Sequence, residues 1–265
     1  MLAPVKIDNR IDAHLGAPPG AGRRPVIIHL HERYGIVQHT MDLGEKFVAA
    51  GYVTIVPDLF SRFSGDRDQL ARGETRADLS DDEVLEDIDA VVDYVKGLPE
   101  ADPDRIAMSG VCQTGRQPVL IGADRDYLSA AVVLYGAVYN DDWASHALRP
   151  EPIQTLLKRI SCPVIGIFGE LDNLVPIPNV LRMLSVLAEA RKSFDVRIHP
   201  DAPHGFLNDT MPGRYRVPQT EAAWNQITSC LQSIFAGEWK RDRAIWRFQS
   251  DSSLDYDFTK NKRWE

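Results

Sequence analysis

The sequence has few cysteines and no long run of apolar residues. Among its 265 residues only three are cysteine, Cys112, Cys162 and Cys230, and they form no CxxC pair. An odd number of widely separated cysteines argues against a disulfide framework and against a zinc ribbon. No segment approaches the ~20 apolar residues that a membrane-spanning helix needs. We therefore expect a protein of the reducing cytoplasm that has no membrane partner.

A basic excess and the usual motifs of cofactor binding are also missing. The formal net charge is −8, whereas nucleic acids and anionic membranes require a basic surface, so the acidity indicates only solubility. The first twenty residues lack the basic start and the apolar stretch of a targeting segment. No glycine-rich phosphate loop follows the first strand pattern, and His29, His31 and His39 are better explained as core and loop residues than as metal ligands. We expect no cofactor, no metal and no nucleic-acid partner.

Short apolar runs alternate with amphipathic segments along most of the chain. Strand-like runs cover residues 25–30, 52–57, 105–109, 130–135, 163–168 and 194–199. Helical patterns cover residues 43–50, 84–95, 178–191 and 220–235, and Ser80 is a candidate cap for the second of them. This alternation predicts an α/β fold, with a doubly wound, mainly parallel sheet and helices on both faces.

Two segments do not fit this alternation. Residues 60–78 are polar and carry four arginines, and they form either a loop over the site or a solvated connection. The tail after Phe235 is too aromatic for a free disordered segment. Its aromatic residues are Trp239, Trp246, Phe248, Tyr256, Phe258 and Trp264. We predict one domain over residues 1–238 and an extension over residues 239–265, which packs on this domain or on a partner subunit of a homodimer.

Cys112 lies in a segment with the pattern of a nucleophile elbow. Residues 109–115 read Ser-Gly-Val-Cys-Gln-Thr-Gly and connect a predicted strand to a predicted helix. In such a strained turn the residue two positions before the nucleophile, here Gly110, must be small, and Thr114 takes the place of the second glycine of the pattern. A helix N-terminus favours a thiolate. The alternative explanation is a buried structural cysteine beside a glycine turn.

An acid and a histidine follow two later strands. Asp172 comes just after the strand ending at Phe168, and His204 follows the strand ending near His199. Alone, Asp172 is better explained as a helix cap or a turn residue, and for His204 a structural and a catalytic explanation are equally good. Together with Cys112 they stand in the order nucleophile, acid, histidine, which is the order of α/β-hydrolases. The order favours a catalytic interpretation of all three.

The chemistry assigns each of these residues a role. Cys112 attacks the acyl carbon as a thiolate, His204 pairs with it and protonates the leaving oxygen, and Asp172 fixes the imidazole tautomer. Two backbone N–H groups must then stabilise the oxyanion. One belongs to Gln113, the residue after the nucleophile, and the other to the loop after the strand at residues 25–30.

The sequence resembles the dienelactone hydrolase family, the carboxymethylenebutenolidases, over residues 20–236. The shared features are the loop with Glu32, Tyr34 and Gly35, the Val-Pro-Asp-Leu at 56–59, the Gly-x-Cys elbow, the Gly-Glu-Leu-Asp at 169–172 and the His-Gly-Phe at 204–206. The resemblance implies an α/β-hydrolase fold and acyl hydrolysis. It also implies that Glu32 contacts the resting thiol and helps to form the thiolate, and that Arg33 provides the second oxyanion N–H. The structural alternative for Glu32 is an ion pair with Arg33 or another arginine.

The sequence departs from the family at the substrate carboxylate. The best-known members grip it with an arginine four residues after the histidine, where this chain has Asn208. Arg76 is a candidate for the family's other arginine, and Tyr34, Arg76 and Asn208 form the expected substrate-binding set. We expect a hydrolase of a small lactone or ester. The alternatives are a general carboxylesterase or thioesterase, and a catalytically degenerate hydrolase fold that serves as a binding module.

Overall fold

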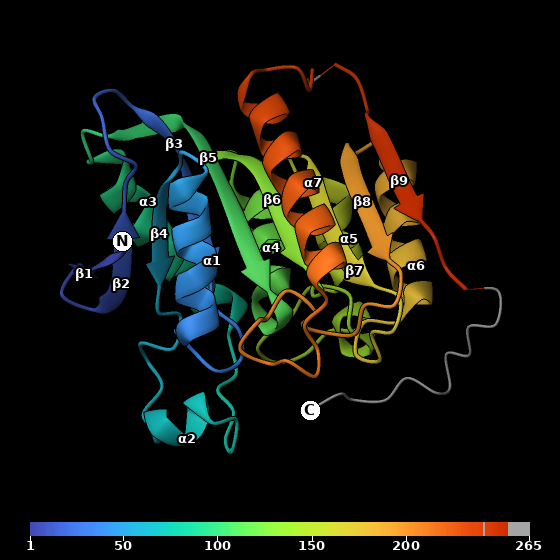
Figure 1. Cartoon of the computed structure of the whole chain (residues 1–265), viewed down its shortest axis with the longest axis horizontal. Helices are drawn as coiled ribbons and strands as arrows, with labels where there is room; N and C mark the ends of the chain where they lie inside the picture. The colour runs from blue at the N-terminus through green and yellow to red at the C-terminus, as the bar shows by residue number, and fades with distance from the viewer. Residues whose placement is uncertain (241, 254–265) are drawn as a thin grey trace.

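The structure is a computed structural model that describes residues 1–240 and 242–253 (Figure 1). The strands are β1 (Ala3–Ile7), β2 (Ile11–Gly16), β3 (Arg24–Leu30), β4 (Val53–Pro57), β5 (Ala101–Val111), β6 (Leu128–Leu134), β7 (Val164–Gly169), β8 (Phe194–His199) and β9 (Trp246–Ser250). The α-helices are α1 (Gln38–Ala49), α2 (Arg67–Ala71), α3 (Asp81–Lys96), α4 (Gln117–Asp124), α5 (Ile153–Arg159), α6 (Ile177–Glu189) and α7 (Val217–Phe235). Two short 3-10 helices, η1 (Cys112–Arg116) and η2 (Asn140–Trp143), follow β5 and β6.

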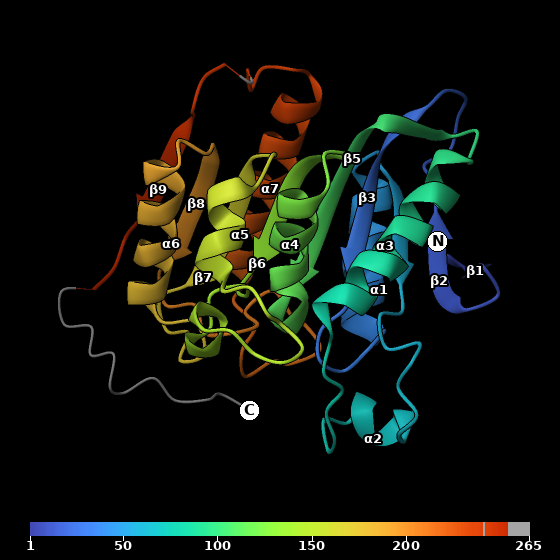
Figure 2. The same cartoon turned by 180° about the vertical axis from the view of Figure 1, so that it is seen from behind.

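Within the described ranges the strands form one sheet in the order β1-β2-β4-β3-β5-β6-β7-β8-β9. The pairs β1–β2 and β2–β4 are antiparallel, and every pair from β4–β3 to β8–β9 is parallel. Helices α1 and α7 cover one face of the sheet (Figure 1), and α3, α4, α5 and α6 cover the other (Figure 2). The predicted doubly wound, mainly parallel α/β fold is confirmed.

The apolar runs become central strands because both faces of the sheet are covered. All residues of β4 and of β7 are buried, as expected for strands packed between two layers of helices. In α3 the residues that recur at helical spacing, Val84, Ile88, Val91 and Val95, are buried, whereas Asp82 and Glu83 are exposed. The core is therefore two apolar layers, one on each face.

The N-terminal hairpin was not predicted. Asp8 and Asn9 form its turn with positive φ values of 50° and 54°, a conformation that these two residue types tolerate. Ile7 and Ile11 flank the turn and are fully buried. The Asp-Asn pair between two isoleucines was the available signal. Ser80 does precede α3, but its side chain makes no capping hydrogen bond, so the candidate cap is wrong in that respect.

Part of the C-terminal extension joins the sheet. Strand β9 pairs in parallel with β8, from Phe194 opposite Trp246 to Ile198 opposite Ser250. The Trp246 ring stacks on Phe194 with centroids 6.4 Å apart. Tyr256, Phe258 and Trp264 lie outside the described residues. The boundary at residue 238 and a partner subunit therefore stay predictions. Across the described ranges, no helix combines the length and the apolar character needed to cross a membrane.

Candidate active site

Cys112 occupies a strained turn at the carboxyl end of β5. Its φ is +53°, in the left-handed region that residues with a side chain rarely adopt. A Cβ atom on Gly110 would lie 2.2 Å from the carbonyl oxygen of Thr114, and one on Gly136 would lie 2.3 Å from that of Cys112. Glycine at these two positions therefore allows the close backbone approach that forms the turn.

Thr114, which replaces the second glycine of the elbow pattern, is fully buried. Its hydroxyl donates to the carbonyl oxygen of His31 over 2.8 Å and accepts the N–H of Val111 over 3.0 Å. The threonine thus joins the elbow to the end of β3. Gly115, one residue later, is the position where small size is needed, because a Cβ atom there would lie 2.7 Å from Gly136 Cα.

His204 lies between the Cys112 sulfur and the Asp172 carboxylate. Its Nε2 is 3.1 Å from Cys112 Sγ, and its Nδ1 is 2.8 Å from Asp172 Oδ2. Asp172 is buried, whereas Cys112 is half-buried and reaches the pocket. The three residues come from the carboxyl ends of β8, β5 and β7, so the parallel sheet brings them together at one edge.

Backbone contacts fix the loops that carry the acid and the histidine. Asp172 Oδ1 accepts the N–H groups of Leu174 at 2.8 Å and Val175 at 2.9 Å, which leaves Oδ2 facing the imidazole. The N–H of Leu171 donates to the carbonyl oxygen of Ala202 over 2.9 Å and joins the two loops.

Glu170 connects the acid loop to the C-terminal extension. Its buried carboxylate accepts the N–H of Asp201 on the histidine loop over 2.9 Å and the N–H of Ser253 over 2.8 Å. The segment that follows β9 therefore contacts the residue two positions before Asp172. Nothing in the sequence motif indicated this contact.

The electrostatic surroundings favour a charged imidazole. Burial by itself would lower the pKa of His204, but the charges of Asp172 and Cys112 and the hydrogen bonds to both outweigh burial and raise this pKa well above its ordinary value. A protonated imidazole beside sulfur can stabilise a thiolate and can later donate its proton.

Tyr139 is a neighbour of the sulfur that sequence reasoning missed. Its hydroxyl lies 3.4 Å from Cys112 Sγ. Tyr139 follows the end of β6, which was predicted as a strand, but no motif marks the loop after it. The only indication in the sequence was the position of Tyr139 after β6, because loops at the carboxyl ends of neighbouring parallel strands lie at the same edge of the sheet.

Glu32 lies in the turn after β3, with 5% of its surface exposed. Its Oε1 is 3.4 Å from Nε2 of His39, and burial raises its pKa to about 7, against opposing effects of His204 and Arg214. Burial also lowers the pKa of His39 to about 4. The described contacts of the sulfur are to His204 and Tyr139, so the expected contact between Glu32 and the resting thiol is not among them. Among the described residues, Glu32 makes no ion pair with Arg33, and the basic side chain nearest to its carboxylate in the contacts above is His39.

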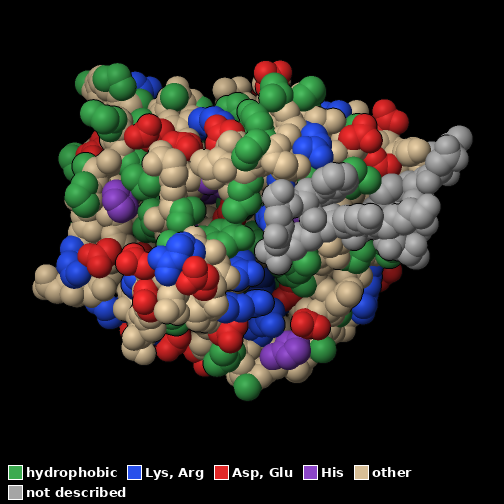
Figure 3. Space-filling view, turned by 60° about the horizontal axis from the view of Figure 1, so that its bottom comes forward, with side chains coloured by type: hydrophobic (Ala, Val, Ile, Leu, Met, Phe, Trp, Pro, Cys, Tyr) green, Lys and Arg blue, Asp and Glu red, His purple; other side chains and the backbone are tan. Residues whose placement is uncertain are grey.

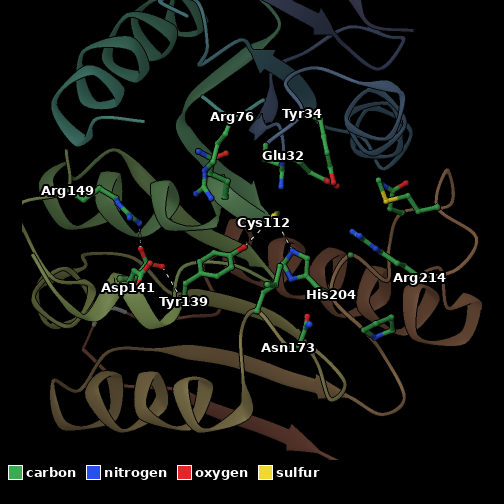
Figure 4. A pocket seen from close by; sticks show the side chains of 18 residues that line it. Glu32, Tyr34, Arg76, Cys112, Tyr139, Asp141, Arg149, Asn173, His204 and Arg214 are labelled. Carbon is green, nitrogen blue, oxygen red and sulfur yellow. Dashed lines mark hydrogen bonds and ion pairs between the residues drawn. The ribbon is translucent and has the colours of Figure 1, made fainter. Parts of the chain in front are cut away.

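These residues border a pocket of about 270 Å³ (Figures 3 and 4). All predicted site residues except Asp172 line it, and Asp172 lies behind His204. Gln113 and Arg33, the predicted oxyanion donors, are both in the pocket lining. Gln113 belongs to η1, and Arg33 lies in the turn closed by the hydrogen bond from Gly35 N–H to the Glu32 carbonyl at 3.1 Å. Among described residues no group of three His, Cys, Asp or Glu side chains is arranged to hold a metal ion.

The predicted substrate-binding residues occupy different parts of the pocket. Asn208 is buried, and its Oδ1 accepts from the backbone N–H and the hydroxyl of Thr210 at 3.0 and 2.6 Å, so this oxygen belongs to a local turn. Arg76 is exposed and lies 3.4 Å from Asp78. Tyr34 lies under the guanidinium of Arg33, which is 5.3 Å from the ring centroid.

Arginines from four segments line the same pocket, namely Arg33, Arg76, Arg149 and Arg214. Sequence reasoning proposed Arg76 as a ligand but missed Arg149 and Arg214. In Figure 4 the Arg214 side chain points toward Cys112 and His204. Arg149 is 2.7 Å from the buried Asp142. Within residues 60–78, only Arg76 lines the pocket, so this end of the segment borders the site. The part that contains α2 extends away from the sheet (Figure 1).

A mainly parallel sheet with a cysteine at the turn after β5, an acid after β7 and a histidine after β8 has the architecture of an α/β-hydrolase. A model of the dienelactone hydrolase family matches residues 11–235. A protein of Methylorubrum extorquens, provisionally named carboxymethylenebutenolidase, is 29% identical over 225 residues, which are 83% of this chain and 76% of that protein. A protein of Escherichia coli with the same provisional name is 31% identical over 229 residues, 84% of this chain and 82% of its own length.

A solved structure from Klebsiella pneumoniae, provisionally named a dienelactone hydrolase, shares the fold. Its TM-score is 0.77 at 24% identity, and the match covers 88% of this chain and 98% of that one. The chain belongs to the dienelactone hydrolase family, and it is a carboxylic ester hydrolase of that kind. The family predicted from the sequence is confirmed.

Proposed function

We propose that this protein hydrolyses small lactones or esters through Cys112, His204 and Asp172. One observation carries the proposal. His204 bridges the sulfur at 3.1 Å and the buried carboxylate at 2.8 Å, and all three residues meet at the pocket edge of the sheet. A structural cysteine in the core would need neither the strained φ of +53° nor a histidine held by a buried acid.

The proposed reaction has two acyl-transfer steps. The Cys112 thiolate attacks the acyl carbon, the carbon–oxygen bond to the leaving group breaks, and His204 gives its proton to the departing alkoxide. Water then gives a proton to His204 and attacks the thioester, and the thiolate leaves. In both steps the N–H groups of Gln113 and Arg33 would stabilise the negative oxygen. For a lactone the alkoxide stays attached to the acyl group, so a single hydroxy acid is released.

Glu32 is proposed as a proton acceptor near this pair. Its pKa of about 7 places it between an acid and a base at neutral pH, which suits proton transfer. Any route from the thiol to Glu32 requires movement of the sulfur from its position at His204, because that is where it lies in the structure.

The pocket's arginines favour a substrate that carries a carboxylate. Asn208 does not provide the cation that the family pattern has at this position, and its Oδ1 is committed to Thr210. Arg214 lies in the pocket lining six residues further on and supplies a positive charge from the same loop. The provisional name of the curated relatives also denotes a lactone substrate.

A substrate panel tests the proposal. Lactones with and without a carboxylate, aryl esters and thioesters are supplied to the wild-type protein, to Cys112→Ala and to the control Cys162→Ala. We expect turnover of lactones or esters that Cys112→Ala abolishes and Cys162→Ala retains. Turnover that persists in Cys112→Ala would overturn the assignment of the nucleophile. A wild-type protein that binds these compounds without hydrolysing any of them would favour the binding-module alternative.

A further inference from the structure

The Cys112 sulfur has two polar neighbours. His204 Nε2 lies 3.1 Å from it and Tyr139 Oη lies 3.4 Å from it. Figure 4 shows both side chains directed at the sulfur, with the Tyr139 and His204 rings 6.3 Å apart by their centroids. A neutral thiol can donate only one proton and accepts weakly, whereas a thiolate accepts from both neighbours. The Tyr139 hydroxyl donates to the sulfur whichever way the proton between Cys112 and His204 lies, and this hydrogen bond is stronger to a thiolate than to a thiol.

Tyr139 is suited to be a permanent donor. Burial raises its pKa well above the ordinary value, and the nearby charges of Cys112, Asp172 and Asp142 raise it further. The hydroxyl therefore keeps its proton throughout the working pH range. Its other neighbour is the carbonyl oxygen of Tyr135 at 3.5 Å, which is a neutral acceptor and a weaker one than a thiolate.

The loop that carries Tyr139 is fixed against the elbow. Ala137 has a φ of +69°, and Gly136 lies so close to the Cys112 carbonyl that a Cβ atom there would be 2.3 Å away. The Tyr139 N–H donates to Asp142 Oδ2 over 3.0 Å, and Asp142 is in turn paired with Arg149 at 2.7 Å. The close packing of Gly136 on the elbow and the hydrogen bond to Asp142 therefore leave the Tyr139 backbone little freedom to move, and its hydroxyl stays beside the sulfur.

We propose that Tyr139 is a catalytic residue that donates a second hydrogen bond to the Cys112 sulfur and stabilises its thiolate form. The inference rests on the proposed function, because it takes Cys112 as the nucleophile. When the thioester forms, the sulfur loses its charge and the hydrogen bond weakens. When water breaks the thioester, the same hydroxyl stabilises the departing thiolate, so Tyr139 acts on both steps.

Loss of a hydrogen bond to the thiolate should change the pH dependence of Cys112 alkylation, whereas loss of a purely structural hydroxyl should not. Without the donor, a smaller fraction of Cys112 is thiolate at acidic pH. Each thiolate that does form is more nucleophilic, because the nucleophilicity of a thiolate rises with its basicity with a Brønsted coefficient of about 0.4–0.5. For Tyr139→Phe we expect the midpoint of the alkylation–pH profile to rise by about one unit, the size of one hydrogen bond to a charged group. We expect the plateau at high pH to rise about threefold.

The experiment measures iodoacetamide alkylation of Cys112 across pH in the wild type, Tyr139→Phe and Tyr52→Phe. Tyr52 is the matched control because its hydroxyl is buried without a hydrogen-bond partner in the described structure and lies outside the pocket. Thiolate absorbance, taken as the difference from Cys112→Ala, gives an independent titration. We expect the wild type and Tyr52→Phe to share one profile and Tyr139→Phe to show the raised midpoint and plateau.

A folded Tyr139→Phe with the wild-type midpoint would overturn this inference, and so would an equal change in Tyr52→Phe. Failure of the proposed function gives a different result, namely ester or lactone turnover that survives Cys112→Ala. If Cys112→Ala is inactive and the Tyr139→Phe profile is unchanged, only the role of Tyr139 is wrong.

Discussion

Thr114 Oγ1 lies 2.8 Å from the carbonyl oxygen of His31, so the side chain that replaces an elbow glycine joins the nucleophile turn to the neighbouring strand. Both residues are fully buried. The departure from the family pattern at this position therefore has a structural explanation. The hydroxyl supplies a hydrogen bond between β3 and the elbow that glycine could not supply.

Thr114→Val keeps the shape of this side chain and removes the hydroxyl. We expect the free energy of unfolding to fall by about 1–3 kcal/mol, because a buried N–H and a buried carbonyl lose their partner. Urea unfolding monitored by fluorescence measures the loss, and Thr114→Ser is the control that retains the hydroxyl. Equal stability of Thr114→Val and the wild type would contradict this role.

Cys112 should be alkylated far faster than Cys162 and Cys230. Burial raises the pKa of each of the latter two thiols to about 12, so they stay protonated at neutral pH, and both are nearly inaccessible. Cys112 is half-buried beside His204 and lines the pocket. Peptide mass spectrometry of native protein treated briefly with iodoacetamide at pH 7 measures the three rates. Similar labelling of all three cysteines would be inconsistent with the proposed nucleophile.

His204→Ala and Cys112→Ala should each lower kcat by about a thousandfold or more, since a nucleophile and its base act as a unit. For the same reason the double variant should lose little beyond either single one. Steady-state kinetics on the best substrate of the panel measure the three rates. Near-wild-type turnover in His204→Ala would mean that another group takes the proton.

Glu32→Gln should change stability in a pH-dependent way. The pKa of Glu32 is about 7 in the folded protein and 4.5 ordinarily, so the unfolded chain releases this proton first and the wild type loses stability as pH rises from about 4.5 to 7. Glutamine does not titrate. The free energy of unfolding of Glu32→Gln minus that of the wild type should therefore be larger at pH 8 than at pH 4, by on the order of 3 kcal/mol. Urea unfolding at the two pH values measures this difference, and a pH-independent difference would exclude the raised pKa.

The same variant should lower turnover, because it removes the proposed proton acceptor while the fold is kept. The defect should shrink toward pH ~8.5, where solvent can ionise a free thiol unaided. A kcat–pH profile for wild type and Glu32→Gln tests this half of the prediction. A defect of equal size at every pH would count against a role in thiolate formation.

Arg214→Gln should reduce kcat/KM for lactones that carry a carboxylate more than for neutral ones, by roughly tenfold or more for loss of a charge-assisted contact. Arg72→Gln is the matched control, because Arg72 is exposed, pairs with Glu74 and is not part of the pocket lining. Asn208→Arg should shift preference further toward the anionic lactones. Paired kinetics on a neutral and an anionic lactone measure the ratio. An unchanged ratio in Arg214→Gln would place the substrate carboxylate elsewhere.

Local chemistry explains which parts of the fold were predictable. Six buried runs and the elbow carry their own signals, because β-branched residues and small turn residues are selected by their immediate surroundings. Tyr139 and Arg214 carry none, since both lie in loops without a motif, and only the folded sheet brings them to the same pocket as Cys112. Thr114 was noticed as a departure, but its partner His31 is supplied by another strand. The hairpin at Ile7 and Ile11 was missed because its alternation is short and mixed with charged residues.

The contact between Ser253 and Glu170 has a practical consequence for handling this protein. A segment beyond the residues that the family model matches provides a hydrogen bond to the loop that positions Asp172. Removing the chain from residue 239 onward, or fusing a bulky partner directly after β9, would therefore alter the support of the acid and not only the edge of the sheet. The amino terminus lies beside β1, at the edge of the sheet opposite to β9, so a tag there leaves the hydrogen bond between Ser253 and Glu170 intact (Figure 1).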